Sequence, residues 1–114
     1  MGSNTSFILG SVLFCLALPA TGAEFLITQQ GETFSELFLK IGNNDVVKFI
    51  NQDSVTHKLS VSYKSKSHTF DDLSPGTSQA IEFNKPGLYD IECSIHENMK
   101  LTVFVPHIMK ASLN

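Results

Sequence analysis

Hydrophobic and polar residues alternate along most of the chain that follows residue 23, in short runs separated by polar turns. Alternation of this kind places every second side chain on the same face of a β-strand. The pattern predicts strands at residues 25–28, 34–41, 46–51, 57–63, 80–83, 88–93 and 100–105. No run has the spacing of an amphipathic helix. Several short strands separated by turns predict an all-β fold, an antiparallel Greek-key β-sandwich.

The connections between these runs are rich in turn-forming residues. Residues 42–45 and 84–87 are both predicted turns, and the second contains a Pro-Gly pair that suits a type II turn. Residues 64–78 are the least regular stretch, with charges of both signs and a second Pro-Gly pair at Pro75 and Gly76. We expect residues 64–78 to be an excursion on the surface of the sandwich.

Three residues with metal-binding side chains lie close together between the last two predicted strands, residues 88–93 and 100–105. Cys93, His96 and Met99 fall within seven residues, so their side chains share one tight loop. Soft sulfur and imidazole donors select copper or zinc over magnesium or calcium. A Cys, two His and a weak axial Met form the donor set of blue-copper electron-transfer sites. The set requires a second histidine from elsewhere in the chain.

His57 is the candidate for that second histidine. In the predicted strand that begins at His57, its side chain shares a face with Leu59 and Val61, so it points toward the core. The same alternation brings Cys93 to the apolar face of its own strand. His57 could instead be a core histidine that bonds a backbone carbonyl, but the nearby sulfur-imidazole loop favours the metal ligand.

The first 23 residues differ in kind from the rest. Lys, Arg, Asp and Glu do not occur before Glu24, residues 7–18 are almost wholly apolar, and small residues follow at 19–23. This order predicts a secretory signal peptide at residues 1–23, which leaves a domain at 24–106 and a tail at 107–114. Because the first six residues lack a basic side chain, retention as an N-terminal anchor is the alternative. Cleavage would leave Cys93 as the one cysteine, excluding a disulfide within the chain.

The length, charge and histidine content of the chain argue against nucleic-acid binding and against an enzyme. A chain of 114 residues with 42% hydrophobic residues forms one domain with a real core. The net charge is -3 and every basic residue is Lys, so a basic stripe for nucleic acid is missing. An enzyme is not expected, because no triad or phosphate loop stands out and the remaining histidines, His68 and His107, are too scattered for a second copper cluster.

These motifs together match a known family. In chain order they are Asn51 six residues before His57, Leu73-x-Pro75-Gly76, Phe83-x-x-Pro86-Gly87-x-Tyr89, and Cys93-x-x-His96-x-x-Met99. Over residues 32–105 the chain resembles the small cupredoxins, single-domain blue-copper proteins that include plastocyanin, pseudoazurin and amicyanin. The two-residue gap between His96 and Met99 is similar to that of amicyanin.

The resemblance implies one type 1 copper per chain, held by strong ligands from His57, Cys93 and His96. Met99 would be the long axial ligand. The resemblance also implies that the Asn51 side chain braces the two ligand-bearing segments by bonding across to the loop. The Lys58 backbone N–H would donate to the Cys93 sulfur.

The function implied is a soluble, monomeric, periplasmic electron carrier that cycles copper between Cu(II) and Cu(I). Its redox partners would include a donor such as a quinoprotein amine dehydrogenase and an acceptor such as a c-type cytochrome. After signal cleavage no membrane association is expected. Ile95, Glu97 and Asn98 stand where amicyanin has prolines beside its histidine, which leaves the partners open. A periplasmic copper chaperone or store is the alternative, and a metal-free protein-binding sandwich is a third.

Overall fold

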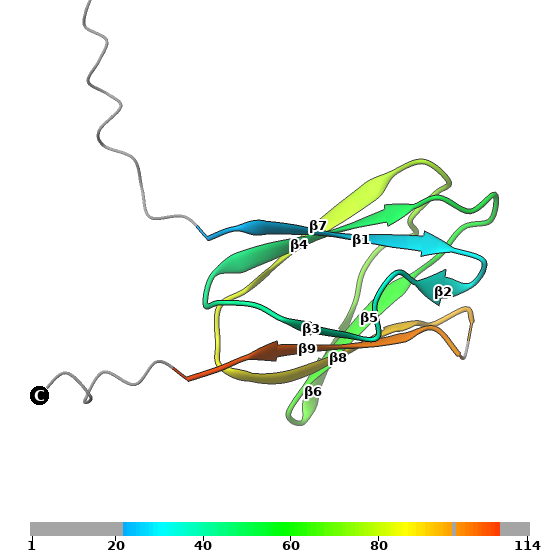
Figure 1. The fold of residues 1–114 in the computed structure, drawn as a ribbon. Helices are drawn as coiled ribbons and strands as arrows, with labels where there is room; N and C mark the ends of the chain where they lie inside the picture. Colours follow the sequence, from blue (N-terminus) through cyan, green and yellow to red (C-terminus); the bar gives the residue numbers. More distant parts are fainter. Residues whose placement is uncertain (1–21, 97, 108–114) are drawn as a thin grey trace, which may run out of the picture.

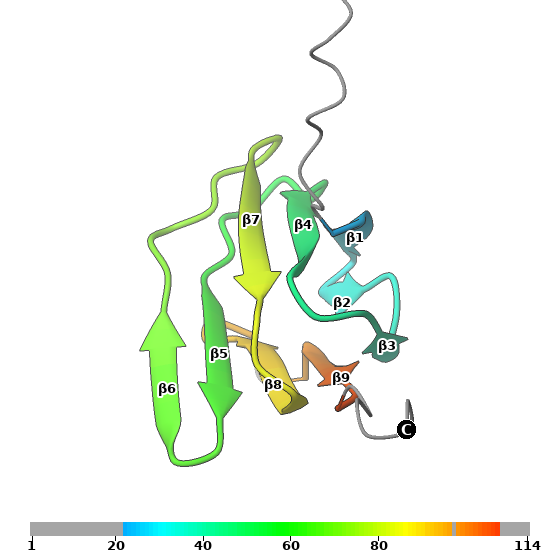
Figure 2. The same ribbon diagram turned by 90° about the vertical axis from the view of Figure 1, so that its left-hand side faces the viewer.

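The computed structural model describes residues 22–96 and 98–107, and every regular element in these ranges is a β-strand (Figure 1). The strands are β1 (Glu24–Gln30), β2 (Thr33–Phe34), β3 (Phe38–Lys40), β4 (Asp45–Asn51), β5 (Leu59–Tyr63), β6 (Lys66–Thr69), β7 (Ser78–Phe83), β8 (Gly87–Cys93) and β9 (Lys100–Val105). They form a four-stranded sheet in the order β2-β1-β4-β7 and a five-stranded sheet in the order β3-β9-β8-β5-β6. The two sheets pack face to face, so the predicted β-sandwich is confirmed (Figures 1 and 2).

Two of the strand pairs run parallel, so the sheets are mixed rather than wholly antiparallel. β1 pairs with β4 in parallel, and β3 pairs with β9 in parallel. The chain leaves β1, crosses to the other sheet at β3 and returns to form β4, which therefore starts at the same end of the sandwich as β1. Parallel neighbours require a crossover of this kind, because a tight hairpin can join antiparallel strands alone.

The core lies between the sheets and is filled by the inward positions of the alternating strands. Val47 and Phe49 of β4 are fully buried, as are Ile91 of β8 and Val103 of β9. The Phe49 ring meets Phe34 edge to face, with 5.9 Å between the ring centroids. Alternate positions of these strands therefore face the core, as the hydrophobic alternation predicted.

The single strand predicted at residues 34–41 is wrong. β2 ends at Phe34 in one sheet and β3 begins at Phe38 in the other, so residues 35–37 carry the chain between the layers. Alternation along the predicted strand would put Leu37 on one face with Leu39 and Ile41, but Leu37 is 79% exposed whereas Ile41 is 4% exposed. Its carbonyl oxygen accepts a hydrogen bond from the Thr102 N–H at 3.0 Å, which ties the crossing segment to β9.

Most of residues 64–78 are exposed as expected, but Leu73 is buried in the core and the stretch contains a strand that was not predicted. β6 pairs antiparallel with β5 and forms the edge of the five-stranded sheet. All four of its residues are exposed, so the strand has no buried face and its sequence shows no alternation of apolar and polar residues. Pro75 and Gly76 form the predicted turn, closed by a hydrogen bond of 3.1 Å from the Thr77 N–H to the Ser74 carbonyl. The φ of Gly76 is 80°, as a type II turn requires.

The predicted division into residues 1–23, 24–106 and 107–114 stays a prediction. β1 begins at Glu24 and β9 ends at Val105. Residues 1–21 of the predicted signal peptide and residues 108–114 of the predicted tail lie outside the described residues. Within the part of the chain that is described, no helix is long and apolar enough to cross a membrane.

Candidate metal centre

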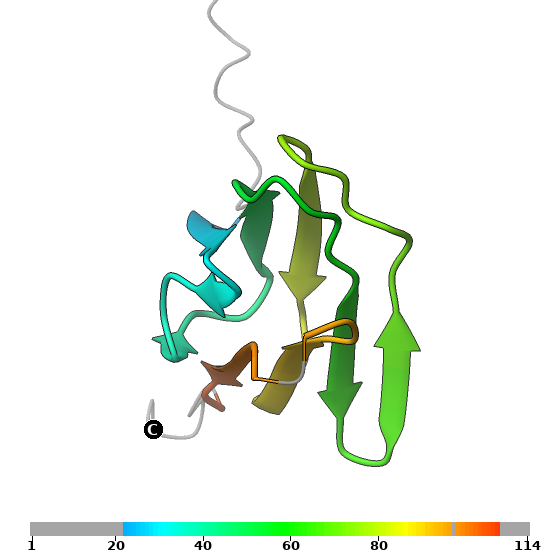
Figure 3. The ribbon, with the colours of Figure 1, turned by 90° about the vertical axis from the view of Figure 1, so that its right-hand side faces the viewer.

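His57, Cys93 and His96 converge at one end of the sandwich, beside the β8–β9 loop, which faces the viewer in Figure 3. Their ligand atoms all lie within 4.8 Å of one another. The His57 Nδ1 atom is 3.4 Å from the Cys93 Sγ atom, and the His96 Nδ1 atom is 3.6 Å from the same sulfur. Both imidazoles therefore turn the same nitrogen toward the thiol.

Strand pairing fixes the first two of these side chains. His57 forms an isolated β-bridge with Leu73, in which each backbone N–H donates to the other residue's carbonyl, at 3.0 and 2.7 Å. Cys93 is the last residue of β8 and pairs with Leu59 of β5. The exposed fractions of His57 and Cys93 are 0% and 2%. Both donors are therefore buried and held by backbone hydrogen bonds.

The loop after Cys93 supplies His96 and Met99. The Ser94 N–H donates to the Lys58 carbonyl at 2.8 Å, the Met99 N–H donates to the His96 carbonyl at 3.2 Å, and the Cys93 N–H donates to the Met99 carbonyl at 3.2 Å. Met99 is fully buried, whereas the His96 side chain is 19% exposed. Glu97 lies outside the described residues. His96 is therefore the one of the three clustered donors that reaches the surface.

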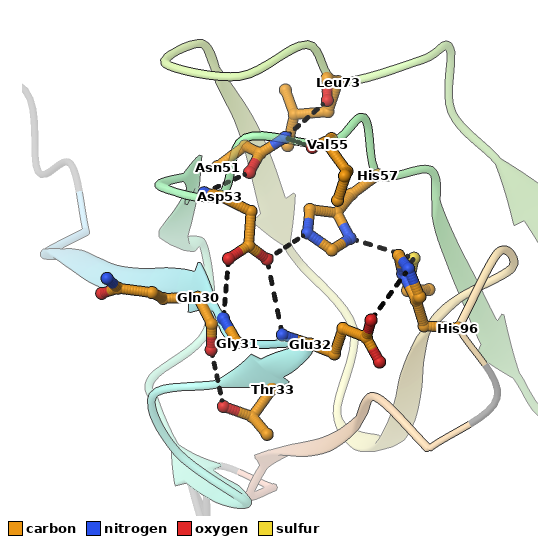
Figure 4. A network of polar contacts seen from close by, with 11 residues as sticks. Gln30, Gly31, Glu32, Thr33, Asn51, Asp53, Val55, His57, Leu73 and His96 are labelled. Carbon is orange, nitrogen blue, oxygen red and sulfur yellow. Dashed lines mark hydrogen bonds and ion pairs between the residues drawn. The ribbon is translucent and has the colours of Figure 1, made fainter.

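Asp53 is a site residue that sequence reasoning missed. One of its carboxylate oxygens lies 2.7 Å from the His57 Nε2 atom, and the other accepts a hydrogen bond from the Gly31 N–H at 2.7 Å (Figure 4). Burial raises the pKa of the Asp53 carboxyl, but the hydrogen bonds from Gly31, His57 and Glu32 outweigh burial and hold it below its ordinary value. An ionised Asp53 favours a proton on the His57 Nε2 atom, which leaves the Nδ1 lone pair facing Cys93.

Two predicted supporting contacts differ in the structure. The Asn51 side chain is fully buried, and its Nδ2 atom donates to the carbonyls of Val55 and Leu73 at 2.8 and 2.9 Å. It thus braces the His57 segment rather than reaching across to the Cys93 loop. Lys58 contacts that loop through its carbonyl, which accepts from Ser94, and not through the predicted N–H to sulfur bond.

The donor chemistry of the cluster fits copper. A thiol sulfur and two imidazole nitrogens converge, with a buried thioether residue in the same loop, and soft sulfur with imidazole suits copper. His68 is exposed in β6, where it lies edge-on to Phe70, and does not join the cluster. His107 is exposed after the end of β9. Neither histidine extends the centre.

Comparison with known proteins gave one curated relative and several solved structures. No family model matches the chain. The methylamine utilization protein MauL of Methylorubrum extorquens AM1 is 27% identical over 94 residues, which cover 82% of each protein. A purple cupredoxin from Nitrosopumilus maritimus is 25% identical with a TM-score of 0.63, covering 71% of this chain and 98% of that one.

Two further solved structures share the fold. The copper-containing nitrite reductase NirK of Thermus scotoductus is 28% identical with a TM-score of 0.68 over 82% of this chain. The chain spans 26% of that reductase. A reduced Cu(I) form of an amicyanin variant is 21% identical, with a TM-score of 0.66 over 78% of this chain and 87% of that one.

Proposed function

The chain has the cupredoxin fold, and on that premise we propose that it is an electron-transfer protein that holds one copper ion. The observation that carries the proposal is the convergence of His57, Cys93 and His96, whose donor atoms lie within 4.8 Å of one another. Met99, fully buried at the end of the same loop, would supply a thioether as the fourth ligand. Bound copper would supply one-electron exchange between Cu(II) and Cu(I).

The protein's own part in this function is to keep the donors in place. His57 and Cys93 are buried and anchored to neighbouring segments by backbone hydrogen bonds, so the fold itself holds them in place. The short loop limits how far His96 moves. Donors fixed by a rigid scaffold reduce the rearrangement that accompanies each electron transfer.

His96 is the proposed point of electron exit and entry, because it is the clustered donor that reaches the surface. Ile95, the residue before His96 in the chain, is 53% exposed, so an apolar side chain adjoins the partly exposed ligand in the sequence. We propose a redox protein as the partner.

Similarity and sequence support the proposed partner and cell compartment. The name of the MauL relative refers to methylamine utilization, which supports an amine dehydrogenase as donor, with a c-type cytochrome as the acceptor that amicyanin likeness suggests. The apolar segment before Glu24 supports export to the periplasm. Both are proposals for this chain.

A carrier is proposed rather than an enzyme. Nitrite reduction belongs to the NirK neighbour, of which this chain spans 26%. Among the described residues, His57, Cys93 and His96 are the one cluster of three or more groups found that could hold a metal. Oxidase or reductase chemistry would need a further metal or an open substrate position beside this centre.

The test is repeated redox cycling in the presence of a copper chelator. The copper-loaded protein is reduced with ascorbate and reoxidised with ferricyanide over many cycles, and copper retained per chain is measured. The proposal predicts one copper per chain throughout, with the His68→Ala variant behaving like the parent. Transfer of copper to the chelator as fast as reduction would contradict the carrier and favour the copper-handling alternative.

A further inference from the structure

Both imidazoles of the centre turn their outer nitrogen toward a carboxylate. The His57 Nε2 atom lies 2.7 Å from Asp53 Oδ2, and the His96 Nε2 atom lies 3.7 Å from Glu32 Oε2 (Figure 4). The inner Nδ1 atoms of both rings face the Cys93 sulfur. The two rings are thus oriented alike, from residues that are far apart in the chain.

The turn between β1 and β2 contacts one of these carboxylates and carries the other. β1 and β2 pair so that Gln30 faces Thr33, which leaves Gly31 and Glu32 as a two-residue hairpin turn. The N–H groups of these turn residues donate to the Asp53 carboxylate, at 2.7 and 3.4 Å. The Glu32 side chain extends from the same turn to His96. One turn therefore reaches both histidines, through Asp53 and directly.

The residue choice in this turn is unfavourable for the backbone. Gly31 has a φ of 66° and Glu32 has a φ of 60°, both in the left-handed region. Turns of this kind favour Gly, Asn or Asp at both positions, because other side chains are strained there. Glu at position 32 is not what the turn itself requires, so its side chain points to a use outside the turn.

We propose that the β1–β2 turn positions both imidazoles for the metal, with Asp53 orienting His57 and Glu32 orienting His96. The inference rests on the proposed function of the centre. The Asp53 carboxylate lies at hydrogen-bond distance from the His57 Nε2 atom, and the Glu32 carboxylate, whose side chain is 66% exposed, lies at ion-pair distance from the His96 Nε2 atom. A carboxylate at either distance favours the proton of a neutral imidazole on Nε2, which leaves the Nδ1 lone pair free. The turn thereby presents both Nδ1 atoms to the metal beside Cys93. Glu32 is a positioning residue and not a ligand.

Glu32→Gly separates this role from the stability of the fold. Glycine adopts the left-handed conformation without strain and keeps the backbone N–H that donates to Asp53, so the turn stays intact. The matched control is Lys64→Gly, because Lys64 is exposed, has a φ of 56° and lies in the hairpin turn between β5 and β6. Both variants should be at least as stable as the parent, measured by urea unfolding.

The decisive readouts are taken from the full chain with and without metal. In the metal-free protein at fixed pH, ¹⁵N NMR of the imidazole rings reports which nitrogen of His96 carries the proton. In the copper-loaded protein, a chelator chase reports the rate of copper loss. Glu32→Gly should shift the His96 ring signals toward a mixture of tautomers and speed copper loss about tenfold, the lower end for residues that support a metal ligand. Lys64→Gly should change neither.

A conservative variant and two separable failures complete the test. Glu32→Gln keeps an acceptor oxygen within reach and should restore most of the parent's ring signals and copper retention. Identical His96 signals and copper loss in Glu32→Gly and Lys64→Gly would overturn the inference while leaving the copper function standing. A parent protein that binds no copper would instead refute the proposed function, and the metal-free ring signals would still decide whether Glu32 orients His96.

Discussion

Asn51→Ala tests whether the hydrogen bonds of the buried Asn51 side chain hold the loop that carries His57. The Asn51 side chain is fully buried and makes three hydrogen bonds. It donates to Val55 and Leu73 and accepts from the Asp53 N–H at 2.8 Å. These contacts hold the loop between β4 and His57, and they include the residue that orients His57. Alanine removes all three without reaching the metal-binding atoms.

The expected loss of unfolding free energy follows from the number of these hydrogen bonds. Each intramolecular hydrogen bond contributes about 1 kcal/mol net, so three amount to roughly 3 kcal/mol of unfolding free energy. The Leu73 carbonyl also accepts the His57 N–H, so it keeps one partner after the substitution. The Val55 carbonyl lies nearer solvent, where water can replace the lost donor. The penalty should therefore not rise far above this sum.

Urea unfolding of the metal-free protein measures the effect, with Asn84→Ala as the control. Asn84 is exposed in the turn before β8, and its substitution should change stability by less than about 0.5 kcal/mol. Asn51→Ala should lower the midpoint without changing the slope, and should weaken copper binding as His57 becomes less well placed. A loss of unfolding free energy smaller than about 1 kcal/mol is what a single hydrogen bond contributes, and it would refute the bracing role.

Sequence reasoning succeeded where one-sided burial sets the pattern. The strands at 46–51, 88–93 and 100–105 each have one face in the core, so their alternation is visible in the sequence. It failed at Leu37, because alternation does not reveal where a chain leaves one sheet for the other. It also missed β6, which is a strand through its pairing with β5 and has no buried face of its own.

The same distinction applies to the centre. Cys93 and His96 are close in sequence, and the strand face of His57 indicates its direction, so their convergence was predictable. Asp53 and Glu32 were not, because their contacts depend on a pairing between distant segments. The parallel register of β1 and β4 sets Gln29 opposite Asn51, which brings the turn after β1 beside the loop after β4. No local spacing in the sequence encodes that register.

Three further substitutions test the core, the pH response and the axial position. Phe49→Ala removes a fully buried ring and should lower the unfolding free energy by about 3–5 kcal/mol in urea, and a loss below about 1 kcal/mol would contradict its core position. Tyr89 donates its hydroxyl to the Lys85 carbonyl at 2.7 Å, and burial raises the pKa of Tyr89 above 10.0. The neutral hydroxyl is thus favoured by folding, so its contribution of about 1 kcal/mol is complete below pH 10 and is lost as the pH rises through the raised pKa. Urea midpoints of the parent and Tyr89→Phe should converge above pH 10, and a constant difference would refute this. Met99→Leu should keep copper bound but raise the reduction potential in voltammetry, because Cu(II) loses a donor, and an unchanged potential would remove Met99 from the proposed ligands.

The central claim is that His57, Cys93 and His96 bind one redox-active copper. The most direct measurement is a titration of the metal-free protein with Cu(II), followed by visible absorption and EPR, beside the Cys93→Ser variant. We expect an intense thiolate-to-copper charge-transfer band that saturates at one copper per chain, bleaches reversibly with reductant and is absent from Cys93→Ser. A colourless or weakly bound complex, or an equal band in the variant, would contradict it.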